Sequence, residues 1–256
     1  MATYKKRGTK KKKTNKDDLS YLAKESTTAE VFTSLDEGAN KIEKFLEQNQ
    51  KWIFSGLLAI IVLIAGYMWY DSNVIQPKEQ KAIDEMVTAQ KYFDQAINDV
   101  DEKQMKEDFD KALNGADGKY GFKQIESKFD GTKAGNLAHY YLGTIYFKQG
   151  DYKQAVSELS KFNADDDVLQ PAAYGMIGDA FMQLEQPKDA LQYYEKAANF
   201  AKNQFTTPRY LLKAGQTALT LGNKDKAKKY FNQIKEDYPS STEARNIDVF
   251  LAEASH

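Results

Sequence analysis

A run of nineteen residues without a charge, from Trp52 to Tyr70, constrains this chain more than any other feature. As a helix, such a run rises about 28 Å, close to the hydrocarbon thickness of a bilayer. Trp52 lies at one end and Trp69 and Tyr70 at the other, where a spanning helix places its interfacial aromatic rings. The sequence therefore predicts a transmembrane helix over 52–70, anchored by Trp52, Trp69 and Tyr70.

Two other kinds of segment also carry apolar runs. A core helix of a soluble protein is rarely apolar over so many residues. A cleaved signal peptide has a shorter apolar region near the N-terminus and a cleavage site of small residues. This run starts at residue 52 and ends in bulky side chains, Tyr67 to Tyr70, so it fits an uncleaved signal anchor better.

Basic residues are concentrated before the apolar run. Residues 1–51 hold 12 Lys/Arg and 8 Asp/Glu, and no acidic residue precedes Asp17. The first basic residues after the run are Lys78 and Lys81. Because Lys/Arg-rich flanks stay on the cytoplasmic side, we expect a cytoplasmic N-terminus and a C-terminal domain on the opposite side.

The segment before the anchor divides in two. Residues 1–25 are basic and polar, which predicts a disordered cytoplasmic tail that contacts either anionic lipid or ribosomal RNA. In residues 26–51, a capping-box pattern at Thr27–Glu30 precedes apolar residues at helical spacing. This pattern predicts an amphipathic cytoplasmic helix that leads into the anchor.

Three similar segments follow in the C-terminal half. Gly143, Gly178 and Gly215 are 35 and 37 residues apart, and an Ala follows each of them after 12 residues, at Ala155, Ala190 and Ala227. A large residue comes four positions later, and these residues are Leu159, Tyr194 and Phe231. The spacing predicts helical hairpins in which small residues let two helices approach closely and the large residue packs inward.

These residues resemble the tetratricopeptide repeat, whose unit places Leu-Gly, an aromatic residue, Ala and a large apolar residue at similar offsets. The first unit matches with Leu142-Gly143, Tyr146 and Ala155. The resemblance implies an all-α solenoid over 136–256 that ends in a capping helix. Residues 71–135 are predicted as a linker helix and a degenerate first repeat, and the linker helix is indicated by the spacing of Ala82, Met86, Ala89, Phe93 and Ile97.

In tetratricopeptide repeats the first helix of each unit lines a concave groove. By that resemblance, the groove positions mix apolar and polar side chains that suit a peptide or a partner's helix. They are Tyr140, Thr144, Phe147 and Lys148 in the first unit, Asp179, Met182 and Gln183 in the second, and Arg209, Leu212 and Gln216 in the third.

Enzyme motifs are missing from the sequence. The chain has no cysteine and two histidines, His139 and His256, and it carries no P-loop, HExxH or GxSxG pattern. The acidic stretch Asp165–Asp167 has the composition of a solvated loop and lacks the spacing of an EF-hand. We therefore expect no catalytic residue, no cofactor, no metal site and no small-molecule substrate.

The overall plan resembles the YfgM-like family, an ancillary subunit of the bacterial SecYEG translocon, in a Bacteroidetes-type form. The resemblance lies in the approach Phe45–Lys51, the exit Gly66–Tyr70 and the repeats. It implies an inner-membrane (cytoplasmic-membrane) scaffold with a periplasmic domain, which associates with SecYEG and a PpiD-like chaperone and assists the export of secreted proteins. An adaptor in cell-envelope assembly or division, which binds peptidoglycan-synthesis proteins, is the alternative.

Overall fold

The computed structural model describes residues 27–255, with side chains from Glu43 onward, and its described residues contain helices and no strands. The predicted all-α fold is confirmed. The predicted basic tail, 1–25, lies outside the described residues. The chain divides into two compact units between Trp69 and Tyr70. The helices are α2 (Thr27–Tyr70), η1 (Asp71–Ile75), α3 (Gln76–Asn98), α4 (Glu102–Asn114), α5 (Phe122–Lys128), α6 (Lys133–Lys148), α7 (Tyr152–Leu159), α8 (Leu169–Gln183), α9 (Pro187–Phe200), α10 (Thr206–Thr220), α11 (Lys224–Asp237), η2 (Glu243–Asn246) and α12 (Ile247–Glu253).

The apolar run lies at the C-terminal end of α2. Its side chains are exposed, for example Trp52 at 81% and Leu63 at 73%. Among the described residues, one helical segment, Glu43–Asn98, is long and apolar enough to cross a membrane. Since water solvates such a surface poorly, α2 needs an apolar environment along this stretch.

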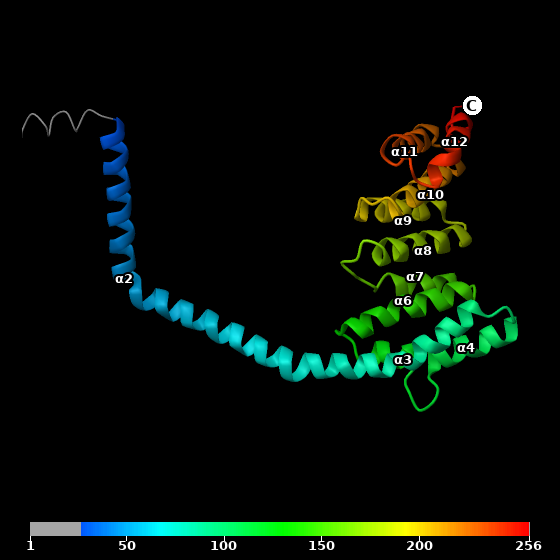
Figure 1. Ribbon diagram of the computed structural model, residues 1–256, viewed down its shortest axis with the longest axis horizontal. Helices are drawn as coiled ribbons and strands as arrows, with labels where there is room; N and C mark the ends of the chain where they lie inside the picture. The colour runs from blue at the N-terminus through cyan, green and yellow to red at the C-terminus, as the bar shows by residue number, and fades with distance from the viewer. Residues whose placement is uncertain (1–26, 256) are drawn as a thin grey trace, which may run out of the picture. The chain divides into compact units, whose positions relative to one another are not determined.

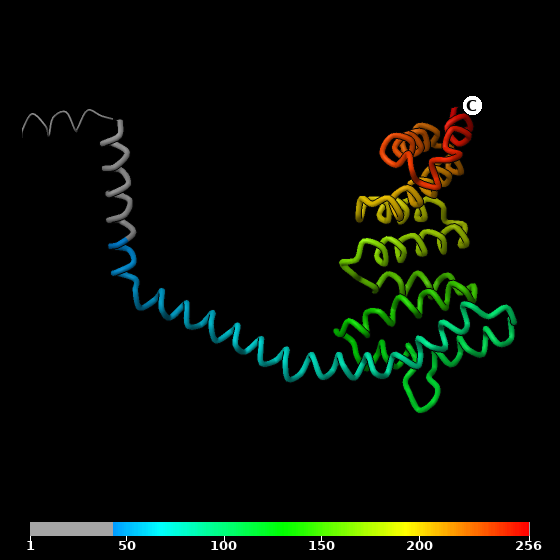
Figure 2. Tube along the Cα trace, in the orientation of Figure 1, coloured from blue at the N-terminus to red at the C-terminus, as the bar shows by residue number. Residues whose placement is uncertain are grey.

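Three helical hairpins, α6–α7, α8–α9 and α10–α11, stack in chain order within the second unit (Figures 1 and 2). A Cβ atom built on Gly143, Gly178 or Gly215 would come within 3.0 Å of the side chain sixteen residues later, which is Leu159, Tyr194 or Phe231. These large residues are at most 3% exposed, and Ala155, Ala190 and Ala227 are fully buried. The predicted close approach of the two helices in each hairpin is therefore confirmed.

The turn inside each hairpin needs a left-handed residue. Gly150 and Gly222 take φ of 81° and 74°, and Glu185 occupies the same place with φ 59°. In each turn the next amide donates five residues back, from Asp151 to Tyr146 O (2.9 Å) in the first. This is the Schellman arrangement, which favours glycine because a Cβ strains the left-handed region.

The start of each second helix is capped in one of two ways. The side chain of Asp151 accepts from the amide of Gln154, and that of Asn223 accepts from the amide of Lys226. The second hairpin instead has Pro187 at the first helical position. The amides at a helix N-terminus have no partner within the helix. The side chains of Asp151 and Asn223 accept from such amides, and Pro187 has no amide hydrogen to leave unpaired.

The stretch predicted as a degenerate first repeat holds three helices. α3 packs against α4, and the short α5 then packs against α6. Ala82, Met86, Ala89 and Phe93 lie on α3, the predicted helix after the anchor, and are buried. Ile97, the last residue of the apolar spacing that predicted this helix, is 46% exposed, and Ala96 beside it is buried. α3 ends at Asn98, so Ala96 and Ile97 both lie in its last turn. Of the two, Ala96 is the one that packs into the core.

The predicted C-terminal cap consists of two short helical segments rather than one continuous helix. A 3-10 turn, η2, comes first, and α12 follows. Ile247 and Ala254 are buried, while Ala244 and Leu251 are partly buried against the same core. These residues cover the open apolar end of the third hairpin, as a terminal cap of a repeat stack does.

The strained turn residue gives a stability test. Glu185→Gly should stabilise the repeat domain by about 0.5–1 kcal/mol, because glycine adopts the left-handed conformation without a Cβ clash. Urea unfolding monitored by circular dichroism measures the change. The neighbouring Gln186 has φ −115°, so Gln186→Gly should destabilise the domain. A loss of stability in Glu185→Gly would contradict the assigned turn geometry.

The close helix crossing in the third hairpin gives a second stability test. Gly215→Ala should destabilise the domain by up to about 2 kcal/mol, because the added methyl meets the buried ring of Phe231, an overpacking that costs about 1–3 kcal/mol. The gain of about 1 kcal/mol in helix propensity offsets part of this cost. With Phe231→Leu as the second substitution, the double variant should lose less than the sum of the two single losses. Simple additivity would argue against the contact.

Candidate partner-binding groove

An ion pair joins the first helices of the second and third hairpins. Lys213 Nζ on α10 lies 2.6 and 2.7 Å from the two carboxylate oxygens of Asp179 on α8. The Tyr194 hydroxyl on α9 donates to the same carboxylate at 2.6 Å. The side chains of Lys213 and Asp179 are about a third exposed, at 35% and 34%. The pair therefore lies at the surface between two repeats and is open to a partner.

A cavity of about 240 Å³ adjoins this pair. Met182 and Tyr194 supply apolar surface, and the remaining side chains are polar. The hydroxyls of Thr217 and Thr220 donate to carbonyls of their own helix, those of Lys213 and Gln216, so the outward group free to adapt is chiefly the exposed Gln216 amide. The lining residues are Met182, Tyr194, Lys213, Gln216, Thr217 and Thr220.

The structure brings two of the predicted groove residues, Met182 and Gln216, to this cavity. Asp179 borders it through its bonds to Lys213 and Tyr194. The other predicted positions differ in exposure. Lys148, Gln183 and Arg209 are exposed, Tyr140, Phe147 and Leu212 are partly buried, and Thr144 is buried.

Thr144 is a correction to the predicted groove. It is 8% exposed, and its hydroxyl donates to the Tyr140 carbonyl at 2.8 Å. A hydroxyl bonded to its own helix in this way offers nothing to a partner. Its equivalents in the later hairpins, Asp179 and Gln216, remain accessible, so the same repeat position faces different surroundings along the stack.

Several predicted positions are occupied by ring contacts. Tyr140 packs on Phe162 with 5.2 Å between ring centroids, and Phe147 packs on Tyr152 at 5.5 Å. The Arg209 guanidinium lies 5.3 Å from the centroid of the Phe205 ring. Each contact is local to one hairpin or one helix start, so these residues do not converge on the cavity.

Three tyrosines on α9, α10 and α11 are buried or partly buried between helices. Burial raises the pKa of Tyr210 to about 12, and its ring fills the space beside Gly175 on α8. Burial, and then the hydrogen bond to Asp179, raises the pKa of Tyr194 far above its usual range. Burial and a hydrogen bond to Glu195 likewise raise the pKa of Tyr230. These phenols therefore stay neutral, and the hydroxyls of Tyr194 and Tyr230 donate hydrogen bonds to a neighbouring helix.

Sequence reasoning missed Lys213 as a groove residue. It aligns with Tyr141 and Met176, which lie three positions before the predicted groove position in their own units. The repeat period contains the missing signal, because Asp179 and Lys213 are 34 residues apart and opposite charges at that separation can meet across adjacent hairpins.

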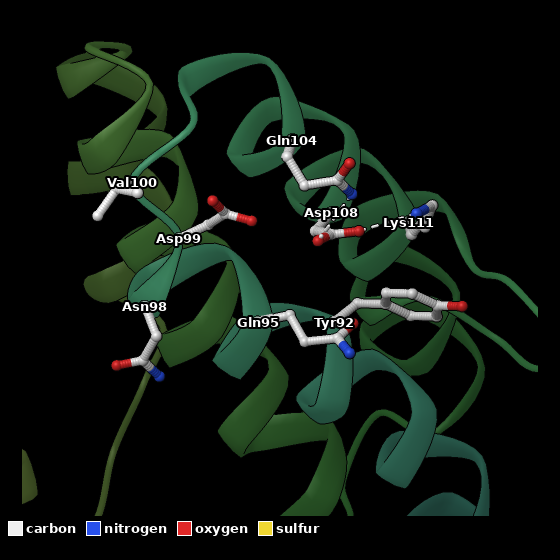
Figure 3. Close-up of a pocket in the computed structure, with 8 residues that line it drawn as sticks. All are labelled: Tyr92, Gln95, Asn98, Asp99, Val100, Gln104, Asp108 and Lys111. Carbon is white, nitrogen blue, oxygen red and sulfur yellow. Dashed lines mark hydrogen bonds and ion pairs between the residues drawn. The ribbon is translucent and has the colours of Figure 1, made fainter.

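A larger depression of about 470 Å³ lies at the α3–α4 connection (Figure 3). It is lined by Tyr92, Gln95, Asn98, Asp99, Val100, Gln104, Asp108 and Lys111. Asp108 is buried, and Lys111 (2.8 Å) and Gln104 (3.2 Å) donate to it. The bond from Lys111 lowers the pKa of Asp108. The buried charge of Asp108 is thus already paired. The rim of the depression ends in the loop that contains the exposed Val100 and does not continue into a groove.

Comparison with known proteins agrees with this architecture. Tetratricopeptide-repeat family models match residues 140–204 and 209–241. A tetratricopeptide repeat-containing protein of Methanocaldococcus jannaschii is 31% identical over 101 residues, which cover 40% of this chain and 17% of that protein. The chain therefore spans about a sixth of that relative's length.

The matched residues contain the three hairpins, the glycine crossings and the cavity described above. Hairpins with this spacing are protein-binding modules, since each stacked unit adds surface to one continuous face. Residues 140–204 and 209–241 thus belong to an all-α solenoid and are similar to tetratricopeptide repeats.

Proposed function

We propose that this chain is a membrane-anchored scaffold whose repeat groove holds a segment of a protein partner. The observation that carries the proposal is the cavity between the second and third hairpins, where Met182 and Tyr194 meet an accessible ion pair. An apolar anchor surrounded by polar groups is typical of surfaces that bind a peptide or a helix.

The anchor part of the proposal rests on α2. Its exposed apolar stretch is bounded by Trp52 and by Trp69 and Tyr70, and we place the cytoplasmic face at the Lys-rich end. The repeat domain then lies on the periplasmic side of a bacterial inner membrane. The proposal also includes the predicted division of the chain into segments that end at residues 25, 51, 70 and 135.

The partners we propose are the SecYEG translocon and a PpiD-like chaperone. Support comes from the plan of the chain, in which a single anchor precedes the repeats and resembles the ancillary translocon subunits. A scaffold of this kind holds a chaperone near the channel exit, so that an emerging chain meets it at high effective concentration. The basic tail adds contact with anionic lipid or the ribosome on the cytoplasmic side.

Affinity purification from gently solubilised membranes tests the groove and its partners together. Gln216→Trp should reduce the recovered partner at least tenfold, because the indole fills the cavity from an exposed position. Quantitative mass spectrometry of co-purified proteins gives the measurement. The control is Gln192→Trp, which makes the same change on the exposed face of α9.

The outcomes separate the two claims. Equal recovery of the partner with both tryptophan variants would contradict the proposed binding groove. If a Gln216-dependent partner appears but translocon and chaperone subunits are absent, the groove stands and the partner assignment fails. Enrichment of peptidoglycan-synthesis proteins would favour the cell-envelope adaptor instead.

Protease protection tests the orientation. Protease added outside intact spheroplasts should digest the repeat domain and leave an N-terminal epitope tag uncut, because the bilayer shields the cytoplasmic tail. Permeabilised spheroplasts provide the control, in which the tag should also be lost. Immunoblots against both ends report the result, and loss of the tag from intact spheroplasts would reverse the topology.

A further inference from the structure

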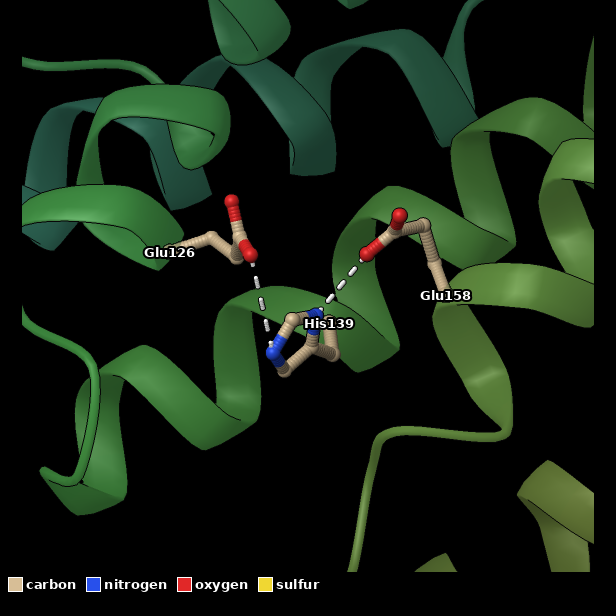
Figure 4. A group of neighbouring side chains, drawn as sticks. All are labelled: Glu126, His139 and Glu158. Atoms are coloured by element: carbon tan, nitrogen blue, oxygen red, sulfur yellow. Dashed lines mark hydrogen bonds and ion pairs between the residues drawn. The ribbon is translucent and has the colours of Figure 1, made fainter.

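Three successive helices bring a histidine and two carboxylates together (Figure 4). Glu126 lies on α5, His139 on α6 and Glu158 on α7, and one potential ligand atom from each lies within 4.8 Å of the others. The His139 side chain is 12% exposed, and those of Glu158 and Glu126 are 17% and 31% exposed. The cluster is thus sheltered but reachable from solvent.

The two ring nitrogens of His139 have different surroundings. Nδ1 lies 2.8 Å from Glu158 Oε2, which is a hydrogen bond that fixes the proton on Nδ1 when the ring is neutral. Nε2 lies 3.9 Å from Glu126 Oε1, too far for a hydrogen bond. In that tautomer Nε2 carries a lone pair that points toward a carboxylate.

This spacing suits a shared metal ion. Two ligand atoms that bind a tetrahedral zinc ion at about 2.1 Å lie about 3.4 Å apart, so a small side-chain adjustment closes the gap. A carboxylate that accepts the other ring N–H is the usual outer partner of a metal-bound histidine, and Glu158 is in that position.

The remaining contacts leave Glu126 available. Among the described residues Glu126 makes no hydrogen bond, whereas Glu158 also accepts from Lys161 Nζ at 3.0 Å. The Lys161 side chain is 48% exposed and can move into solvent. Its present bond neutralises Glu158, which therefore serves better as an orienting group than as a direct ligand.

We propose that His139 Nε2 and Glu126 bind a divalent transition-metal ion such as zinc, with Glu158 as the orienting group and water in the other coordination positions. Imidazole nitrogen favours such an ion over Mg²⁺, which prefers oxygen ligands. The bound ion joins α5 to α6, and so couples the three opening helices to the first repeat hairpin.

The composition makes the site easy to isolate experimentally. The chain has no cysteine, and His256 is its other histidine. Tight zinc binding by an untagged protein therefore has two possible imidazole sources, and single substitutions distinguish them. The proposal concerns the repeat domain alone and is independent of which partner fills the groove.

Isothermal titration of the full-length, untagged chain in detergent micelles tests the site, with ZnCl₂ as the probe. The titration should show one zinc ion bound per chain. In a separate thermal unfolding experiment, zinc at a hundredfold excess over Kd should raise Tm by about 5 °C. Glu126→Gln and His139→Gln should abolish that binding, while Glu158→Gln should weaken it about 10–100-fold. MgCl₂ at the same concentration should leave Tm unchanged.

His256→Gln is the matched control and should bind zinc like the unsubstituted chain. If His139→Gln fails to fold, Glu126→Gln carries the test, since Glu126 is partly exposed and its replacement removes no hydrogen bond. Absence of zinc binding, unchanged binding in Glu126→Gln, or loss of binding in His256→Gln would each overturn the proposal.

Discussion

The close approach of two helices at the glycine that recurs in each hairpin is the contact on which the rest of the solenoid depends. At Gly143, Gly178 and Gly215 the missing side chain leaves room for Leu159, Tyr194 and Phe231. That contact sets how near the two helices of a hairpin lie, and therefore which side chains reach the next hairpin. The Asp179–Lys213 pair joins α8 and α10, the first helices of neighbouring hairpins, which both pack against α9.

Local spacing was sufficient to predict most of the solenoid. The repeated Gly and Ala positions predicted the crossings because one period contains one hairpin, and the structure confirms them. Outside the repeats the sequence predicted a helix from apolar spacing alone. Ile97 follows the apolar spacing of α3 but lies in its last turn and is 46% exposed.

The groove cavity and the His139 cluster were less predictable, because their contacts join residues that are far apart in the sequence. Met182 and Gln216 could be inferred from repeat position, but Lys213 reaches Asp179 by a diagonal contact between hairpins. His139 gave no signal in the sequence, since Glu126 and Glu158 precede and follow it by 13 and 19 residues without a ligand motif. Only packing of α5, α6 and α7 brings the three together.

The repeats separate the residues that hold the fold from those that vary the surface. Glycine recurs at the crossing, yet the next position is Thr144, Asp179 and then Gln216. The first of these is buried, the second forms an ion pair and the third is exposed. Because the crossing does not depend on this position, its side chain can change from hairpin to hairpin at little cost in stability. Specificity for a partner can therefore arise at the α8–α10 junction while the scaffold beneath it stays constant.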